Sequence, residues 1–86
     1  MIKITLLTKD DCAFCDQAKD ALQRLSVDFP VAVETYDLES DAGLQAAQAA
    51  GALFAPVVLL NGTAFSQGRL SERKLRRQLE RLVSIA

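Results

Sequence analysis

Cys12 and Cys15 are the only cysteines in the sequence, and their spacing forms a C-x-x-C motif. The chain has no histidine, which excludes imidazole-based acid–base catalysis and cysteine–histidine nucleophile pairs. A structural zinc site needs four ligands, and two thiolates without imidazole do not supply them. A disulfide between residues so close in the chain adds little stability, because the loop that it closes is short. The two cysteines therefore indicate thiol–disulfide redox chemistry.

The motif follows an expected strand and opens an expected helix. Unpaired backbone N–H groups and the helix dipole stabilise an anion at a helix N-terminus, so Cys12 is favoured as a thiolate, the reactive form of cysteine. Cys15 lies one turn later on the same side, close enough to form a disulfide. We expect Cys12 to be the exposed attacking thiol and Cys15 the more buried resolving thiol. The alternative is that both are small core residues.

Hydrophobic periodicity predicts the elements that position this motif. The expected strands cover residues 2–7, 31–36, 56–60 and 63–65, and the expected helices cover residues 13–26, 42–50 and 72–85. Asp10 and Asp11 are residue types that cap the N-terminus of a helix, and Ser71 can cap the last helix. Asn61-Gly62 is a strong hairpin signal, so the last two strands are expected to pair.

Helical spacing also predicts which side chains face the core. The expected core side chains of the first helix are Phe14, Ala18, Ala21, Leu22 and Leu25, and those of the last helix are Leu75, Leu79, Leu82 and Val83. Strands joined through a helix are parallel with a right-handed crossover, and the hairpin adds an antiparallel pair. The order β-α-β-α-β-β-α therefore predicts an α/β fold with a four-stranded mixed sheet flanked by three helices, which cover both faces.

Composition limits the classes of function. The 86 residues are expected to form a single domain, residues 1–86, and half of them are hydrophobic. A formal net charge of −1 argues against a globally basic nucleic-acid binder. The longest apolar run, about residues 51–60, is far shorter than the ~20 residues of a membrane span, and the N-terminus lacks the organisation of a signal peptide. We expect a cytoplasmic monomer that binds neither nucleic acid nor a membrane.

Charge is distributed unevenly along the chain. Residues 1–43 carry 4 basic and 9 acidic residues, whereas residues 44–86 carry 6 basic and 2 acidic residues. Most basic residues of the second half lie on the last expected helix: Arg73, Lys74, Arg76, Arg77 and Arg81. This face can bind an acidic partner, or it can be a solvated surface near a helix C-terminus.

Several segments resemble dithiol glutaredoxins. Residues 6–15, LLTKDDCAFC, are similar to the strand-Thr-Lys-x-x-Cys-x-x-Cys opening of that family, and residues 54–58, FAPVV, are similar to its Thr-Val-Pro segment. The Ala-Pro-Val-Val pattern is also similar to the redoxins that reduce ribonucleotide reductase. Gly62 and residues 68–71, GRLS, align as well. The resemblance covers nearly the whole chain and implies a thioredoxin-like fold of the glutaredoxin type and a thiol–disulfide oxidoreductase.

The resemblance implies roles for individual residues near the motif. Cys12 would be the nucleophile, and Cys15 would be its resolving partner. Pro56 would be the family's cis-proline, which faces the disulfide, and Ala55 would offer its backbone N–H and C=O to an extended substrate. Lys9 resembles the lysine that contacts a carboxylate of glutathione.

Further substrate-binding roles are implied before the last helix. Gly68 lies in the loop that glutathione approaches in the family, and the backbone amides of Ser71 and Glu72 could receive a carboxylate. Two departures affect this substrate site. The motif reads Cys-Ala-Phe-Cys in place of Cys-Pro-Tyr-Cys, and Ser66 and Gln67 stand where the family has a glycine pair that admits glutathione. We expect these two side chains to crowd that end of the site.

Asp10, Asp11 and Asp16 flank the cysteines, and their charges oppose thiolate formation and repel glutathione, which is itself negative. We expect no bound cofactor, a protein or small-molecule disulfide as substrate, and glutathione or a thioredoxin-reductase-type protein as electron donor. Weak use of glutathione and better reduction by a protein reductase are predicted. Two other functions stay open. One is an iron–sulfur cluster held between two chains through Cys12 and glutathione; the other is a non-catalytic adaptor that binds a partner through its basic last helix.

Overall fold

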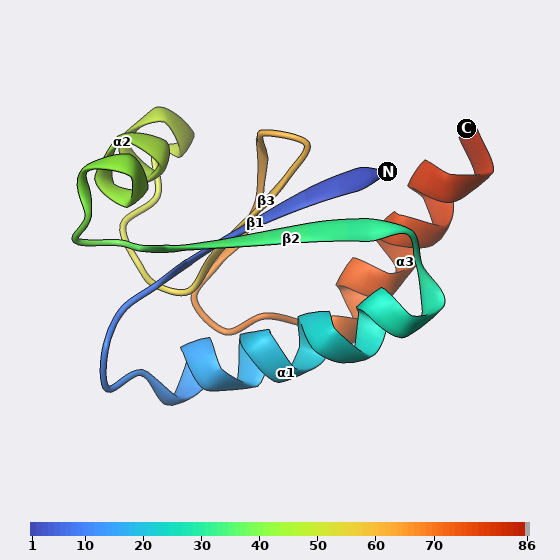
Figure 1. The fold of residues 1–86 in the computed structure, drawn as a ribbon, viewed down its shortest axis with the longest axis horizontal. Helices are drawn as coiled ribbons and strands as arrows, with labels where there is room; N and C mark the ends of the chain where they lie inside the picture. Colours follow the sequence, from blue (N-terminus) through green and yellow to red (C-terminus); the bar gives the residue numbers. More distant parts are fainter. Residues whose placement is uncertain (86) are drawn as a thin grey trace.

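The computed structural model describes residues 1–85 and has the expected order of strands and helices (Figure 1). Its elements are β1 (Ile2–Thr8), α1 (Ala13–Asp28), β2 (Val31–Asp37), α2 (Asp41–Ala50), β3 (Val57–Leu60), β4 (Thr63–Gln67) and α3 (Glu72–Ile85). The strands form one four-stranded mixed sheet, so the fold class inferred from the sequence is confirmed. The last residue of the expected domain lies outside the described residues.

The sheet has the strand order β2-β1-β3-β4, so β1 and β3 lie at its centre. β1 is parallel to β2 and antiparallel to β3, and in the second pairing Leu7 lies opposite Val57. β3 and β4 form the expected hairpin, and both turn residues have the left-handed conformation that a tight two-residue turn needs (Asn61 φ 49°, Gly62 φ 84°). The end of β1 and the beginning of β3 therefore lie at the same end of the sheet.

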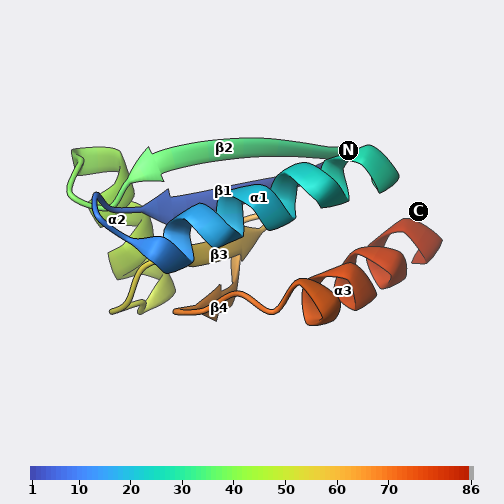
Figure 2. The same ribbon diagram turned by 90° about the horizontal axis from the view of Figure 1, so that it is seen from below.

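Helices cover both faces of the sheet, as Figures 1 and 2 show. α1 and α3 pack on the face to which Ile4, Leu6 and Val58 point, and these three side chains are fully buried. α2 packs on the opposite face, where its Ala47 joins a smaller cluster around Leu7. Burial of one large aliphatic side chain contributes about 1.5–3 kcal/mol, so the larger cluster fixes α1 and α3 against the central strands.

Two side chains predicted to lie in the core are exposed. Phe14 is 47% exposed in the first turn of α1, where the buried side chain is that of Cys15. Val83 is also exposed, and Figure 2 shows that the last turns of α3 extend beyond the sheet. The remaining predicted core residues of the two helices are buried or partly buried, so the helical faces were otherwise predicted correctly.

Most element ends differ from the prediction by one or two residues, and two of the differences affect the cysteine end of the sheet. Neither Asp10 nor Asp11 caps α1, because the N-cap is Cys12 itself, whose Sγ accepts a hydrogen bond from a backbone N–H of the first turn. β4 is longer than expected, since Ser66 and Gln67 also pair with β3 beyond a bulge that interrupts the hairpin register. The longer strand brings Gln67 to the same end of the sheet as the cysteines.

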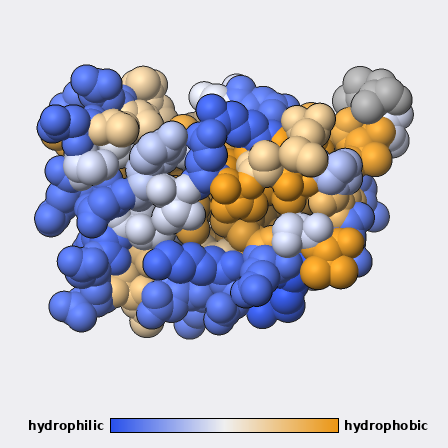
Figure 3. All heavy atoms as spheres, viewed as in Figure 1, coloured by the Kyte–Doolittle hydropathy of each residue, from blue (hydrophilic) through white to orange (hydrophobic). Residues whose placement is uncertain are grey.

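An apolar area lies in the middle of the face where α1 meets the sheet, and Figure 3 shows hydrophilic side chains along its lower border. A hollow of about 220 Å³ between α1 and β2 is lined by the apolar side chains of Leu6, Leu22 and Val33 and by four polar residues, Lys19, Gln23, Ser26 and Thr35. Neither cysteine lines it, so it is separate from the redox motif. No helix in the described part of the chain combines the length and apolar character that a membrane crossing needs.

The start of α2 is held tightly against the end of β2. The Asp37 carbonyl accepts hydrogen bonds from the Ser40 backbone N–H (3.0 Å) and hydroxyl (2.6 Å). The Ser40 hydroxyl oxygen in turn accepts the Gly43 N–H (3.1 Å) and caps the helix. A Cβ atom at Gly43 would overlap the Asp37 carbonyl, so only glycine allows this close approach.

Gly43→Ala is therefore expected to destabilise the fold by about 1–3 kcal/mol, as overpacking does, although alanine normally favours a helix over glycine by up to ~1 kcal/mol. Thermal or urea denaturation measures the effect. The matched control is Ala42→Gly at an exposed position of the same turn, which should lose only the helix propensity. A Gly43→Ala protein more stable than the parent would contradict the close packing.

Candidate active site

Cys12 and Cys15 form a disulfide at the N-terminus of α1, with 5.2 Å between their Cα atoms. Cys12 is the N-cap residue and is partly exposed, whereas Cys15 lies in the first turn and is only 1% exposed. The Cys12 Sγ accepts a hydrogen bond from the Cys15 backbone N–H (3.1 Å). In the reduced protein the same N–H can stabilise a Cys12 thiolate, together with the positive end of the helix dipole.

The chain enters α1 through a sharp turn at Asp11, whose backbone is left-handed (φ 51°). Aspartate adopts this conformation more readily than most residues, because its short side chain bonds locally. Asp10, Asp11 and Asp16 are all exposed near the cysteines, which gives this end of the molecule negative charge. The charges are evident in the sequence, whereas the left-handed turn at Asp11 was not predicted from it.

The Ala55–Pro56 peptide bond is cis, as expected from the resemblance. Pro56 is buried and directly precedes β3, and the pairing of Leu7 with Val57 puts it beside the end of β1. Ala55 is partly exposed, and within residues 1–85 neither its N–H nor its C=O takes part in a hydrogen bond. The loop therefore offers an unpaired stretch of backbone at the end of the sheet where α1 begins.

Gln67 and Gly68, at the end of β4, hold this loop in place. The Gln67 side-chain oxygen accepts the backbone N–H groups of Leu53 (2.8 Å) and Phe54 (3.2 Å). Gly68 donates its N–H to the Pro56 carbonyl (2.9 Å) and has a left-handed backbone (φ 77°) that glycine adopts without strain. No local sequence pattern indicates the Gln67 bridge, because its partners lie 13 and 14 residues away and only the register of the sheet brings them together.

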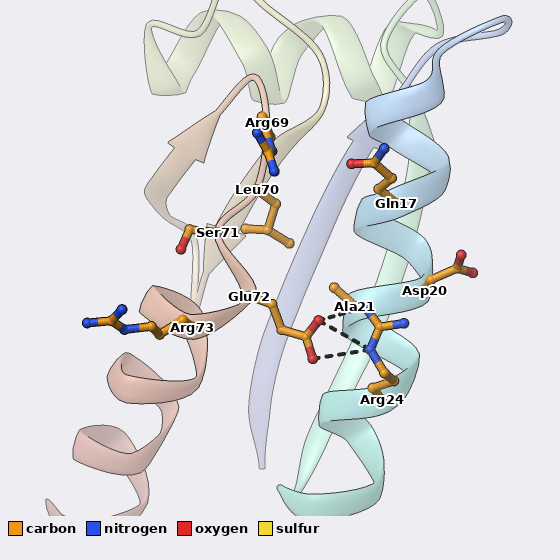
Figure 4. A pocket seen from close by; sticks show the side chains of 9 residues that line it. All are labelled: Gln17, Asp20, Ala21, Arg24, Arg69, Leu70, Ser71, Glu72 and Arg73. Carbon is orange, nitrogen blue, oxygen red and sulfur yellow. Dashed lines mark hydrogen bonds and ion pairs between the residues drawn. The ribbon is translucent and has the colours of Figure 1, made fainter.

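Of the other predicted site residues, Lys9 lies at the cysteine end of the sheet, whereas Ser71 lies beside the middle of α1, across a groove from Asp20 and Ala21. Lys9 is exposed and directly follows β1. Ser71 precedes α3 and caps it, since its hydroxyl accepts the Lys74 N–H (3.3 Å). Figure 4 shows that a groove of about 600 Å³ separates the start of α3 from α1, with Arg69 and Gln17 facing each other near its upper end. The roles in substrate binding inferred for these residues remain predictions.

An ion pair closes the lower part of this groove. Arg24 of α1 donates two hydrogen bonds from Nε (3.2 Å each) and one from Nη2 (2.6 Å) to the carboxylate of Glu72 of α3 (Figure 4). The Arg24 hydrogen bonds hold the pKa of Glu72 below its ordinary value, and Glu72 raises the pKa of Arg24. The pair joins the two helices across the lower part of the groove, and neither cysteine lines the groove.

Exposed apolar side chains also gather at the cysteine end. Phe14 lies between the two cysteines in sequence, and the loop before Pro56 carries Leu53 (79% exposed) and Phe54 (65% exposed). The topology puts this loop and the start of α1 at the same end of the sheet, as Figures 1 and 2 also show. Exposed apolar residues around a reactive group are typical of a surface that contacts another protein.

The structure has a thioredoxin-like fold with a disulfide in its C-x-x-C motif. Thioredoxin 1 from Thermosipho africanus superposes with a TM-score of 0.73 at 20% identity and covers 96% of each chain. A mutant thioredoxin from Halobacterium salinarum gives 0.74 at 21% identity, over 93% of this chain and 73% of that chain. Thioredoxin O2 from Arabidopsis thaliana in its oxidized state gives 0.74 at 17% identity, over 95% and 75%.

The family is identified by sequence. A model described as "Glutaredoxin-like domain (DUF836)" matches residues 3–80, and the chain therefore belongs to this family of glutaredoxin-like domains. A search of curated proteins gives no match. The match covers both cysteines, Pro56, Gly68 and Ser71, so it confirms the family resemblance that these residues suggested.

The difference in burial between the two cysteines predicts different reactivity. When the reduced protein is treated briefly with iodoacetamide near neutral pH, most of the label should be on Cys12, because Cys15 is covered. Both cysteines lie in the tryptic peptide of residues 10–19, so fragmentation mass spectrometry distinguishes them. Denatured protein is the control and should be labelled at both positions. Preferential labelling of Cys15 in the folded protein would reverse the assignment.

Proposed function

We propose that the chain is a thiol–disulfide oxidoreductase that reduces protein or small-molecule disulfides through Cys12 and Cys15. The observation that carries the proposal is the asymmetry of the motif: Cys12 is partly exposed at the helix N-cap, and Cys15 is buried one turn later. Membership of the glutaredoxin-like family and the thioredoxin-like fold support a redox role.

The proposed reaction transfers two electrons. The Cys12 thiolate attacks one sulfur of the substrate disulfide and expels the other as a thiolate, which forms a mixed disulfide. The Cys15 thiolate then attacks the Cys12 sulfur, which releases the second substrate thiol and leaves the Cys12–Cys15 disulfide. Two thiols of glutathione, or one dithiol of a protein reductase, supply the two electrons that restore the reduced motif. The reaction needs no bound cofactor.

Substrate would bind along the loop before Pro56. The unpaired N–H and C=O of Ala55 can pair with an extended substrate backbone, as an added strand does. Gln67 and Gly68 support this role because they hold the loop through three backbone groups. In this proposal Lys9 and the amides at Ser71 would receive carboxylate groups of the substrate.

The mechanism predicts opposite outcomes for the two cysteine variants. Cys15→Ser should accumulate a stable mixed disulfide through Cys12, because no other thiol in the chain can resolve it. Cys12→Ser, the matched control, should form no adduct and should show no dithiol exchange. Incubation with glutathione disulfide or a disulfide-bonded protein, followed by non-reducing gels and mass spectrometry, measures both results. Dithiol exchange by Cys12→Ser would exclude the mechanism.

A protein reductase is the proposed electron donor, in preference to glutathione. Asp10, Asp11 and Asp16 repel a negatively charged tripeptide near Cys12. Gln67 fills part of the space that a glycine pair leaves open in the family, and its hydrogen bonds to Leu53 and Phe54 hold it there. The exposed apolar side chains at this end favour contact with a protein surface.

Turnover of a small disulfide with each donor, under matched conditions, tests this choice. We expect slow turnover with glutathione and glutathione reductase and faster turnover with a thioredoxin-reductase-type protein. Asp11→Asn keeps the left-handed backbone and removes one charge, so it should raise the glutathione rate at low salt and lose this advantage at high salt. Glutathione-dependent turnover as fast as that of an ordinary dithiol glutaredoxin, measured alongside, would overturn the proposal.

A further inference from the structure

A second groove lies on the far side of α3 from α1. It has a volume of about 460 Å³ and runs between β4 and α3. Its basic lining residues are Arg69, Lys74, Arg77 and Arg81, and all four are exposed. Lys74, Arg77 and Arg81 are spaced three and four residues apart, so they lie on one face of α3. The opposite face of the helix carries Leu75 and other core residues, which fixes the basic face toward the groove.

No acidic residue within residues 1–85 lines this groove. In residues 1–85 the basic members of the ion pairs are Lys3, Arg24 and Arg76. No ion pair within these residues includes a basic residue of the groove. Of the two acidic residues on α3, Glu72 is paired with Arg24 on the side of α1, and Glu80 does not line the groove. The four positive charges are therefore uncompensated by side chains of the groove itself and attract an anionic group.

The other wall of the groove is an open strand edge. β4 is the last strand in the sheet order and pairs with β3 alone, so one edge of its backbone has no partner strand. Phe65 and Ser66 of β4 line the groove, and both are partly buried. An edge of this kind can accept an extended peptide as an additional strand.

We propose that this groove binds an acidic, extended segment of a partner protein. The backbone of the segment would pair with the free edge of β4, and its carboxylates would reach Lys74, Arg77 and Arg81. The site goes beyond the proposed redox function, because neither cysteine lines the groove and the binding requires neither of them; Ser71 lines it and also has a proposed role in substrate binding.

The observations favour a peptide over a nucleic acid. A strand edge offers N–H and C=O groups in the spacing that a peptide backbone matches, whereas a phosphate backbone does not. The first half of the chain, residues 1–43, has 9 acidic and 4 basic residues and would repel a polyanion that extends past the groove. A short acidic segment is attracted by the basic residues of the groove and does not extend to the acidic residues that would repel a longer polyanion.

The probe for the experiment is a blocked synthetic decapeptide in which glutamate alternates with valine. Binding is measured by titration calorimetry and by amide chemical shifts of the oxidised, full-length protein. We expect saturable binding with shifts concentrated in β4 and the basic face of α3, and no binding of the same peptide with glutamine in place of glutamate. Arg77→Glu should weaken binding by roughly tenfold, because it replaces a charge that attracts glutamate with one that repels it.

Lys19→Glu is the matched control, since it makes the same change in net charge at an exposed position on α1 outside the groove. An equal loss of affinity in Lys19→Glu and Arg77→Glu would mean general charge attraction and would overturn the site. Binding of single-stranded DNA but not of the peptide, or self-association that Arg77→Glu abolishes, would also overturn it. Binding should persist in a protein with Cys12→Ser and Cys15→Ser, so failure of the redox proposal and failure of this one are distinguishable.

Discussion

The antiparallel pairing of β1 with β3 is the constraint on which the rest of the molecule depends. Leu7 opposite Val57 puts the end of one central strand beside the start of the other. The cysteine turn leaves the first strand, and the loop with the cis-proline leads into the second, so a single register brings two distant segments together. β4 extends the same register and adds Gly68, whose N–H bonds the Pro56 carbonyl. A slip by one residue would move Pro56 away from α1 and turn the core residues of β3 toward the wrong face.

The strand pairing does not provide a partner strand for the loop before Pro56. The Gln67 side chain makes the hydrogen bonds that a partner strand would otherwise make. Its oxygen accepts two consecutive N–H groups, those of Leu53 and Phe54, which no backbone carbonyl of the sheet reaches. A glutamine side chain can do this because its terminal carbonyl oxygen is a good hydrogen-bond acceptor and the side chain is long enough to reach from the strand to the loop. A glycine pair at this position, as in the dithiol glutaredoxins that the sequence resembles, would leave more space but would provide no side chain to make these hydrogen bonds.

Periodicity and turn residues predicted the strands, the helices and the hairpin because these depend on nearest neighbours in the chain. Asn61-Gly62 has the left-handed backbone that its residue types favour, and Ser71 caps α3 as its type favours. The failures occur where tertiary position outweighs local preference. Phe14 has the right helical phase, but the buried side chain of the first turn of α1 is that of Cys15. Asp11 takes a left-handed turn, and the N-cap is Cys12. The Gln67 bridge joins residues that no local pattern connects.

Opposite charges occupy two parts of the surface, and their arrangement limits how any partner can approach. The acidic residues around Cys12 and the basic groove between β4 and α3 belong to one small rigid frame. A protein that used both surfaces at once would need an acidic segment for the groove and a neutral or basic surface around its own disulfide. A partner bound the other way round would place its acidic segment beside the acidic residues near Cys12 and its basic surface beside the basic groove. This repulsion costs free energy and slows association. The uneven distribution of charge along the sequence therefore limits how a partner can be oriented, because the fold places the acidic residues near Cys12 and the basic residues in the groove between β4 and α3.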